Sequence, residues 1–183
     1  MKGVLFNVAE DVVNETLGAA AWDGALRHAC VDGIYTSIGD YPHGELDAIV
    51  DAIAGSTGLA PADVLRHVGR HGYEPLVQRQ PALVAGIDDL GALLHRLEEV
   101  IHPEVHKLYP DATPPEFSVA DLGPGSWELV YRSDRGLCHL AEGLVQGAAA
   151  SFATTVEVVQ TDCALEGADR CVLQVRTETA SDA

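Results

Sequence analysis

Basic residues, aromatic residues and long apolar runs are all scarce in this chain of 183 residues. Eleven Lys and Arg stand against 28 Asp and Glu, which gives a formal net charge of −17. Nucleic acids and anionic membrane surfaces recruit proteins through basic patches, so this balance excludes both as expected partners. It favours instead a partner protein with a basic face.

No apolar run approaches the ~20 residues that a membrane-spanning helix needs. Glu10 interrupts the opening segment before a signal peptide could form, so we expect a cytoplasmic protein. In that compartment cysteines are thiols or metal ligands more often than disulfides. The chain has four of them: Cys30, Cys138, Cys163 and Cys171.

Apolar residues at helical spacing dominate the first part of the chain. They predict helices within residues 1–30 and around Leu46–Ile53. A further helix should begin at Pro61, which suits a first turn, and end near Arg70. The segment His71–Pro75, with its glycine and proline, should break it.

The longest apolar stripe runs from Leu83 to Leu108 at spacings of three and four residues, which predicts one long helix. Pro103 lies inside this stripe. Because proline cannot donate a backbone hydrogen bond, it should kink the helix just after His102.

Strand patterns begin at Phe117 and predict a small antiparallel sheet. The predicted strands are Phe117–Ala120, Trp127–Tyr131, Thr154–Thr161 and Cys171–Thr177, with a helix at Gly136–Ser151. The expected fold is therefore α+β. A helical lobe of about residues 1–62 should pack on a second lobe, residues 63–183, that holds the remaining helices and about four strands.

Eight histidines raise the question of a metal site. His102 and His106 are spaced i, i+4 and could share an ion, but the zinc-protease pattern needs Glu where Pro103 stands. His102 also follows Ile101 at the border of the apolar stripe, where an axial haem ligand would lie. A histidine packed at a helix kink explains the same position, and from composition and spacing both interpretations stay open.

The combination of four motifs resembles the haem nitric oxide/oxygen-binding (H-NOX) family, which includes the sensor domain of soluble guanylate cyclase. The motifs are His102, Tyr109-Pro110, Ala112-Thr113-Pro114-Pro115 and Tyr131-x-Ser133-x-Arg135. The opening MKGVLFNVAEDVV and the segment CHLAEGLVQG are also similar to that family. The resemblance covers the whole chain, and it implies one domain with haem b between the two lobes.

The resemblance assigns roles to these residues. His102 corresponds to the proximal ligand of the haem iron, and Tyr131, Ser133 and Arg135 to the residues that bind the haem propionates. Charge-assisted donors suit two carboxylates in a buried pocket. If the three lie on one strand, they share a face by its period of two. Pro115 corresponds to a proline that presses on the haem and distorts it.

Further matches concern the gas-binding pocket. Leu5 and Leu144 match apolar pocket positions, although ordinary core packing explains them equally well. Oxygen-binding members carry a tyrosine where this chain has Leu140 and a tryptophan where it has Ala9, so no donor is available to stabilise bound oxygen. We therefore expect a ferrous haem that binds nitric oxide and CO but forms no stable oxygen complex. Tyr73 is an alternative donor if it reaches the pocket.

The resemblance also implies how a signal is passed on. Nitric oxide weakens the iron–His102 bond, the helix carrying His102 is released, and the lobes shift. No output domain follows in this sequence, so the expected partner is a separate protein. Histidine kinases and cyclic-di-GMP enzymes (diguanylate cyclases or phosphodiesterases) are the common partners of stand-alone bacterial members. A haem enzyme is not expected, because no second histidine falls on the presumed pocket face.

Cys138, Cys163 and Cys171 match a spacing that holds zinc in some members of this family. There a histidine supplies the fourth ligand, at the position of Gln160 in this chain. His139 and Cys30 are substitutes to consider, and a redox-responsive thiol group or inert cysteines are alternatives to zinc. The alternative function is accordingly a redox sensor that uses haem and these thiols, and a metal-free acidic interaction domain is a third interpretation.

Overall fold

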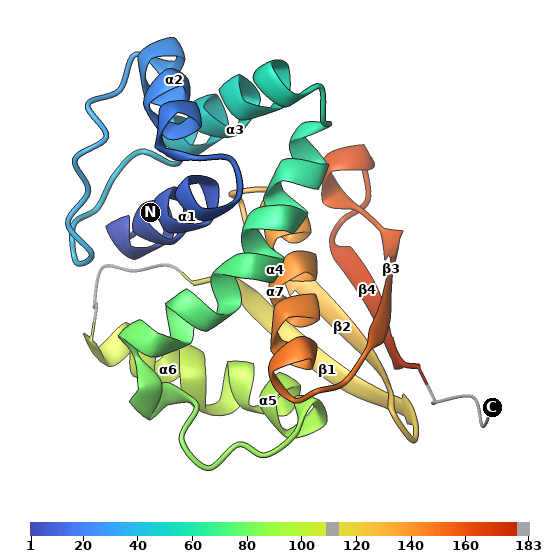
Figure 1. Cartoon of the computed structure of the whole chain (residues 1–183). Coiled ribbons are helices and arrows are strands. Elements are labelled where there is room, and N and C mark those ends of the chain that lie inside the picture. The colour runs from blue at the N-terminus through green and yellow to red at the C-terminus, as the bar shows by residue number, and fades with distance from the viewer. Residues whose placement is uncertain (109–113, 179–183) are drawn as a thin grey trace.

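The computed structural model describes residues 1–108 and 114–178 and confirms the predicted α+β class (Figure 1). Seven α-helices lie in these residues: α1 Gly3–Thr16, α2 Ala19–Ala29, α3 His43–Thr57, α4 Pro61–Arg79, α5 Leu90–Arg96, α6 His102–Leu108 and α7 Cys138–Ser151. The strands are β1 Glu116–Gly123, β2 Ser126–Arg132, β3 Val156–Asp162 and β4 Cys171–Thr177. Short 3-10 turns at Pro81–Leu83 and Ala164–Glu166 and a π turn at Leu97–Ile101 complete the list.

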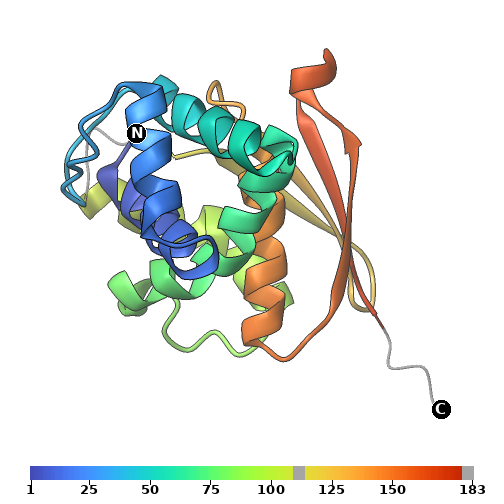
Figure 2. The same ribbon diagram turned by 45° about the horizontal axis from the view of Figure 1, so that its top comes forward.

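The four strands form one antiparallel sheet in the order β1-β2-β4-β3. A tight turn between Gly123 and Ser126 joins β1 to β2, and β4 has the predicted bounds. The helices lie on one side of this sheet (Figure 2). Helices α5 and α7 pack on it, where Leu94 and Val145 meet Leu129 and Leu173 in a buried cluster.

The largest hydrophobic cluster joins α1, α2 and α3 to the rest of the chain. Phe6, Val12 and Ile49 from the first helices pack with Val68 of α4 and Leu140 of α7. Burying an aliphatic or phenyl side chain contributes about 1.5–3 kcal/mol, so this shared core ties the N-terminal helices firmly to α4 and α7. The proposed division into residues 1–62 and 63–183 falls at the start of α4, inside that shared core.

Helices α4 and α7 cross in the middle of the molecule with their backbones in contact (Figure 1). A Cβ atom on Gly69 would lie 2.3 Å from the carbonyl oxygen of Leu140, and one on Gly143 would lie 2.2 Å from that of Arg66. Any larger residue at either position would have to push the helices apart. The two glycines therefore set the separation of the two central helices.

The predicted end of the fourth helix near Arg70 is wrong, because α4 continues through Gly72 and Pro75 to Arg79. Pro75 removes one helical hydrogen bond at a cost of about 3 kcal/mol. Gly72 allows α1 to come close, since a Cβ there would lie 2.6 Å from a methyl carbon of Val8. Packing against α1 and α7 outweighs the local breaking signal.

The predicted start of the long helix at Leu83 is also wrong. Residues 81–83 form a 3-10 turn, and α5 begins at Leu90, where the carboxylate of Asp89 accepts a hydrogen bond from the Ala92 amide at 2.8 Å. Such a cap fixes a helix start. The irregularity expected just after His102 instead precedes it. It is a π turn in which the His102 amide donates to the carbonyl of Leu97.

Among the described residues, no helix taken alone has both the length and the apolar character needed to cross a bilayer. Helices α3 and α4 meet those criteria only as a pair, and the chain bends by 106° between them.

Candidate functional site

His102 is the first residue of α6, directly after the π turn. Its side chain is half-buried. The imidazole stacks on the ring of Phe117 in β1, with centroids 5.5 Å apart and planes inclined by 27°. π turns occur often at functional sites, because the extra residue rotates the side chains that follow it.

Phe117 in turn meets Tyr131 of β2, with ring centroids 5.3 Å apart in an edge-to-face arrangement. Tyr131 is only 3% exposed, and burial raises the pKa of its phenol, although a hydrogen bond with Ser133 opposes that shift. The neutral phenol can donate a hydrogen bond to an anion. One ring therefore separates the predicted iron ligand from the first residue of the predicted propionate site.

Ser133 and Arg135 do not share a strand face with Tyr131, so that expectation is wrong. Strand β2 ends at Arg132, and the chain turns before α7, with Gly136 at a φ of +63°. Within this turn the Ser133 hydroxyl accepts a hydrogen bond from the Arg135 amide at 3.2 Å. The turn, rather than the strand, holds the two residues beside Tyr131.

Positive charge gathers near this turn although the chain is strongly acidic. Lys2 donates a hydrogen bond of 2.5 Å to the carboxylate of Asp40, and this bond is the main reason that the pKa of Asp40 is lowered. The charge of Arg135 contributes a smaller effect in the same direction, so both cations act on this part of the chain. Basic side chains of this kind can pair with the carboxylates of a ligand.

A small apolar cavity of about 20 Å³ lies between α1, α3, α4 and α7. Its walls contain only aliphatic side chains: Leu5, Val8, Ala9, Leu46, Val50, Leu65, Val68, Leu76, Leu140 and Leu144. A space of this size holds about one water-sized molecule, but a water here would find no side-chain hydrogen-bond partner. The structure thus brings all four positions predicted to line the gas pocket, Leu5, Ala9, Leu140 and Leu144, to one cavity.

Other predicted site residues lie elsewhere. Tyr73 packs against the cluster beneath the sheet and is not among the residues that line the cavity. Pro115 is half-buried just before β1. The motif residues 109–113, including Tyr109-Pro110, fall outside the described residues.

The residues present fit a haem by their chemistry. The imidazole of His102 can ligate iron, the turn at 131–135 offers donors to carboxylates, and the aliphatic cavity suits a hydrocarbon ring face. The volume alone does not fit, because pockets for molecules of this class measure about 300–1,000 Å³.

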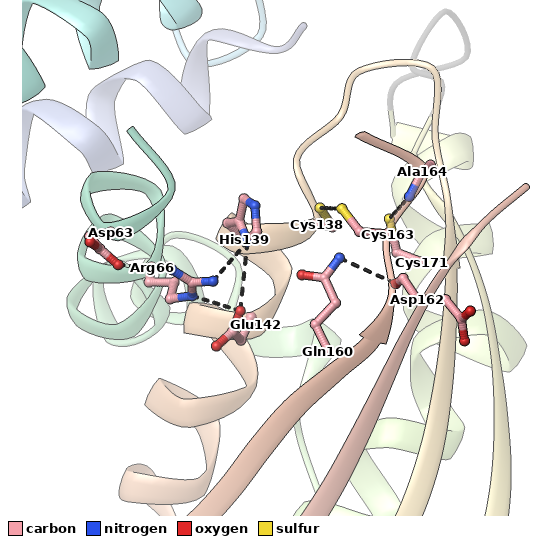
Figure 3. Close-up of polar contacts among 10 residues, drawn as sticks. All are labelled: Asp63, Arg66, Cys138, His139, Glu142, Gln160, Asp162, Cys163, Ala164 and Cys171. Atoms are coloured by element: carbon pink, nitrogen blue, oxygen red, sulfur yellow. Dashed lines mark hydrogen bonds and ion pairs between the residues drawn. The ribbon is translucent and has the colours of Figure 1, made fainter. Parts of the chain in front are cut away.

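Three buried cysteines form a second cluster at the end of the sheet (Figure 3). The sulfur atoms of Cys138 and Cys163 are 3.9 Å apart, and Cys171 accepts a hydrogen bond from the Ala164 amide at 3.3 Å. Burial raises the pKa of the Cys138 thiol to about 12; the neighbouring thiols add to this, and a hydrogen bond from Gln160 opposes it. Cys30 is exposed at the end of α2 and is not part of the cluster.

His139, not Gln160, joins the thiols as a candidate ligand. Its imidazole and the sulfur atoms of Cys138 and Cys163 all lie within 4.8 Å of one another. The same imidazole lies 3.2 Å from a guanidinium nitrogen of Arg66, which also donates to the buried Glu142 at 2.7 Å (Figure 3). This network was not predicted from the sequence. The only local signal for it is Glu142, the one acidic residue in a mostly apolar helix.

Comparison with known proteins places these features in context. A family model described as haem-NO-binding matches residues 2–160. The crystal structure of an H-NOX protein from S. oneidensis in the Fe(II)NO state is 34% identical, with a TM-score of 0.91 over 98% of this chain and 100% of that one. An unliganded Fe(II) H-NOX protein from K. algicida is 26% identical, with a TM-score of 0.86 over the full length of both chains.

The H-NOX domain from Shewanella oneidensis in the Fe(II)CO state is 33% identical, with a TM-score of 0.87 over 98% of this chain and 99% of that one. Among curated protein sequences, none matches the chain.

Proposed function

The chain belongs to the haem-NO-binding (H-NOX) family of haem-based gas sensor domains, and from this membership we propose that it senses nitric oxide. One observation carries the proposal: the cavity that gathers Leu5, Ala9, Leu140 and Leu144 has a purely aliphatic wall. Domains of this family sense ligands rather than catalyse reactions, and we propose no catalytic activity.

Haem b, when bound, supplies a ferrous iron that takes up diatomic gases. In the proposed arrangement His102 holds the iron through an imidazole nitrogen, while Phe117 supports the imidazole by stacking. Tyr131, Ser133 and Arg135 bind the propionates through two hydroxyl groups and a guanidinium. Pro115 contacts the ring near the start of β1.

Selectivity among gases follows from the cavity wall. Bound oxygen carries partial negative charge and is stabilised by a hydrogen-bond donor, whereas nitric oxide and CO need none. Leu140 and Ala9 offer no donor, and Tyr73 packs against the cluster beneath the sheet instead of lining the cavity. We therefore expect binding of nitric oxide and CO without stable binding of oxygen.

The position of His102 indicates how binding reaches the rest of the molecule. Because His102 is the first residue of α6, holding or releasing its imidazole acts on the start of that helix. Movement there would shift the lobe of residues 1–62 against residues 63–183. The receiver is a separate signalling protein with a basic face, such as a histidine kinase or a cyclic-di-GMP enzyme, in the cytoplasm.

The visible absorption spectrum of the ferrous protein, recorded before and after nitric oxide, tests this function. Nitric oxide should shift the spectrum to that of a haem that has lost its histidine ligand, and CO should shift it while the histidine stays bound. Air should give no lasting oxygen-bound spectrum. A colourless protein after expression with ample haem would refute the proposal.

A second candidate function, a thiol-based redox sensor, rests on the 3.9 Å between the sulfur atoms of Cys138 and Cys163. A disulfide needs about 2.05 Å, so a small shift would let the pair lose two electrons and two protons to an oxidant such as peroxide. Control of a partner by thiol oxidation, without any response to nitric oxide, would favour this function.

The same cluster is the proposed zinc site, with Cys138, Cys163, Cys171 and His139 as ligands. Zinc prefers four protein ligands in structural sites. Metal analysis should find one zinc per haem iron if the site is structural, and no zinc if the cysteines serve only as thiols.

A further inference from the structure

Helix α4 carries two histidines one turn apart on a face separate from the gas cavity. His67 and His71 are spaced i, i+4, and their ring centroids are 4.4 Å apart with the planes inclined by 46°. The residues by which α4 lines the cavity are Leu65, Val68 and Leu76. At 100° per residue the mean direction of these three residues differs from that of the two histidines by about 130°, so the imidazoles lie on a separate face of α4.

The surroundings leave both imidazoles accessible. His71 is exposed and His67 is partly exposed. The Nε2 atom of His67 lies 3.1 Å from the hydroxyl of Thr16 at the end of α1, and that hydroxyl donates its own hydrogen to the carbonyl of Val12. Burial lowers the pKa of His67, with His71 and Arg70 adding to the effect, so its imidazole is neutral at physiological pH.

We propose that His67 and His71 form a surface chelate for a divalent transition-metal ion, bound by two imidazole nitrogens with water completing the coordination. Imidazole suits Cu²⁺, Ni²⁺ and Zn²⁺, and affinity for such a site rises toward Cu²⁺. In the described parts of the chain, the only group of three or more potential ligands close together is the one at Cys138, His139 and Cys163. The pair on α4 is therefore a two-ligand site, open to exchange rather than structural.

Two charged neighbours affect the binding of a metal ion at this site. The positive charge of Arg70, which lies between the two histidines in the sequence, repels a bound cation. The carboxylate of Glu74, one turn beyond His71, accepts a hydrogen bond from Gln78 at 3.1 Å and partly offsets that charge. Because the Thr16 hydroxyl gives its hydrogen to Val12, its lone pair accepts the Nε2 hydrogen of His67, which leaves Nδ1 of His67 as the ligand atom.

Ni²⁺ titration by calorimetry tests the proposal on the full, haem-loaded chain. Ni²⁺ does not oxidise thiols, and a Cys30→Ser background removes the exposed sulfur. One equivalent should bind, and His67→Ala and His71→Ala should each weaken it at least about tenfold, since loss of even an outer partner of a ligand costs about 10–100-fold. His95→Ala, which removes an exposed histidine on α5, is the control and should bind like the parent.

Electron paramagnetic resonance with Cu²⁺ gives an independent count of ligands. The parent should show two coupled nitrogens, and each single variant one. Equal Ni²⁺ affinity in the parent and both single variants, or a spectrum with no loss of nitrogen on substitution, would overturn the proposal. Neither measurement depends on gas binding, so failure of the metal-site proposal would leave the proposed sensor function untouched.

Discussion

The imidazole of His102 stacks on the ring of Phe117 across the gap between α6 and β1, 5.5 Å from centroid to centroid. Because Phe117 also meets Tyr131, this single ring bridges the proposed iron ligand and the proposed propionate site. From the sequence, Phe117 was expected only to begin a strand. The contact gives it a positioning role that depends on no ligand.

Replacement of His102 by Ala should abolish haem retention, because the proposed iron ligand is lost. His106→Ala is the matched control, since His106 lies one turn along α6 and is exposed. The measurement is the ratio of haem absorbance to protein after identical expression and purification. Equal ratios for both variants would show that His102 is not the ligand.

Substitution of Leu140 by Tyr should introduce a hydrogen-bond donor into the aliphatic cavity and allow a lasting oxygen complex. Leu140→Phe adds nearly the same volume without a hydroxyl and should not. Both will destabilise the fold by about 1–3 kcal/mol, because the cavity has little spare room. Spectra of the ferrous proteins in air, followed for an hour, decide the matter. Indistinguishable behaviour of the two variants would contradict the role given to Leu140.

Gly143→Ala should lower the free energy of unfolding by about 1–3 kcal/mol or more, since its Cβ would meet the backbone of Arg66 at 2.2 Å. Gly55→Ala in α3 is the control. Nothing lies within 4 Å of its Cβ, so this change should stabilise the protein by about 0.5–1 kcal/mol. Urea unfolding measures both, and a neutral Gly143→Ala would mean that α4 and α7 can separate at little cost.

One thiol in four should react rapidly with a disulfide reagent in the native protein. Cys30 is exposed, whereas the other three cysteines are buried and the pKa of Cys138 is raised to about 12, which keeps it protonated. Cys30→Ser should remove the fast phase, and denaturation should release the remaining three thiols. A fast phase that persists in that variant would place a reactive thiol in the buried cluster.

Stability should fall in mild acid partly through His67. Its pKa in the folded state is lowered below the ordinary value of about 6.5, mainly by burial, so the unfolded chain binds a proton more readily. The stability that neutral His67 contributes to the folded state is fully present above pH 6.5. It is lost as the pH falls from there toward the folded-state pKa of His67. Urea unfolding at about pH 7.5 and pH 5, with a chelator present, should show a smaller loss for His67→Gln than for the parent. If His67→Gln and the parent lost the same stability between the two pH values, groups other than His67 would cause the acid sensitivity.

Much of the fold could be predicted from periodicity alone. The alternation of Cys171–Thr177 is a local signal, and the strand that it predicts is confirmed. The course of α4 through Gly72 and Pro75 was not predictable, because it depends on the close approach of α1 and α7, which no local pattern records. Tertiary packing overrides local propensity in this way wherever small residues let backbones touch.

The functional site, like the fold, was predictable from the sequence only in part. The resemblance supplied the positions that line the cavity, and the structure gathers them, but periodicity put Ser133 and Arg135 on a strand that ends before them. The approach of His139 to Cys163, and the link from Arg66 to Glu142, join segments more than 20 residues apart. Such contacts follow from topology and leave almost no trace in the local sequence.

The π turn before His102 holds one residue more than an α-helical turn of the same length. The position of this extra residue can change: exchanging i→i−5 for i→i−4 hydrogen bonds moves the bulge along the helix while the helix stays intact. Each such exchange rotates the residue that the bulge passes by about 100° and advances it by about 1.5 Å along the axis. If the extra residue moved past His102, the imidazole would rotate away from Phe117 while α5 kept its contacts with the sheet.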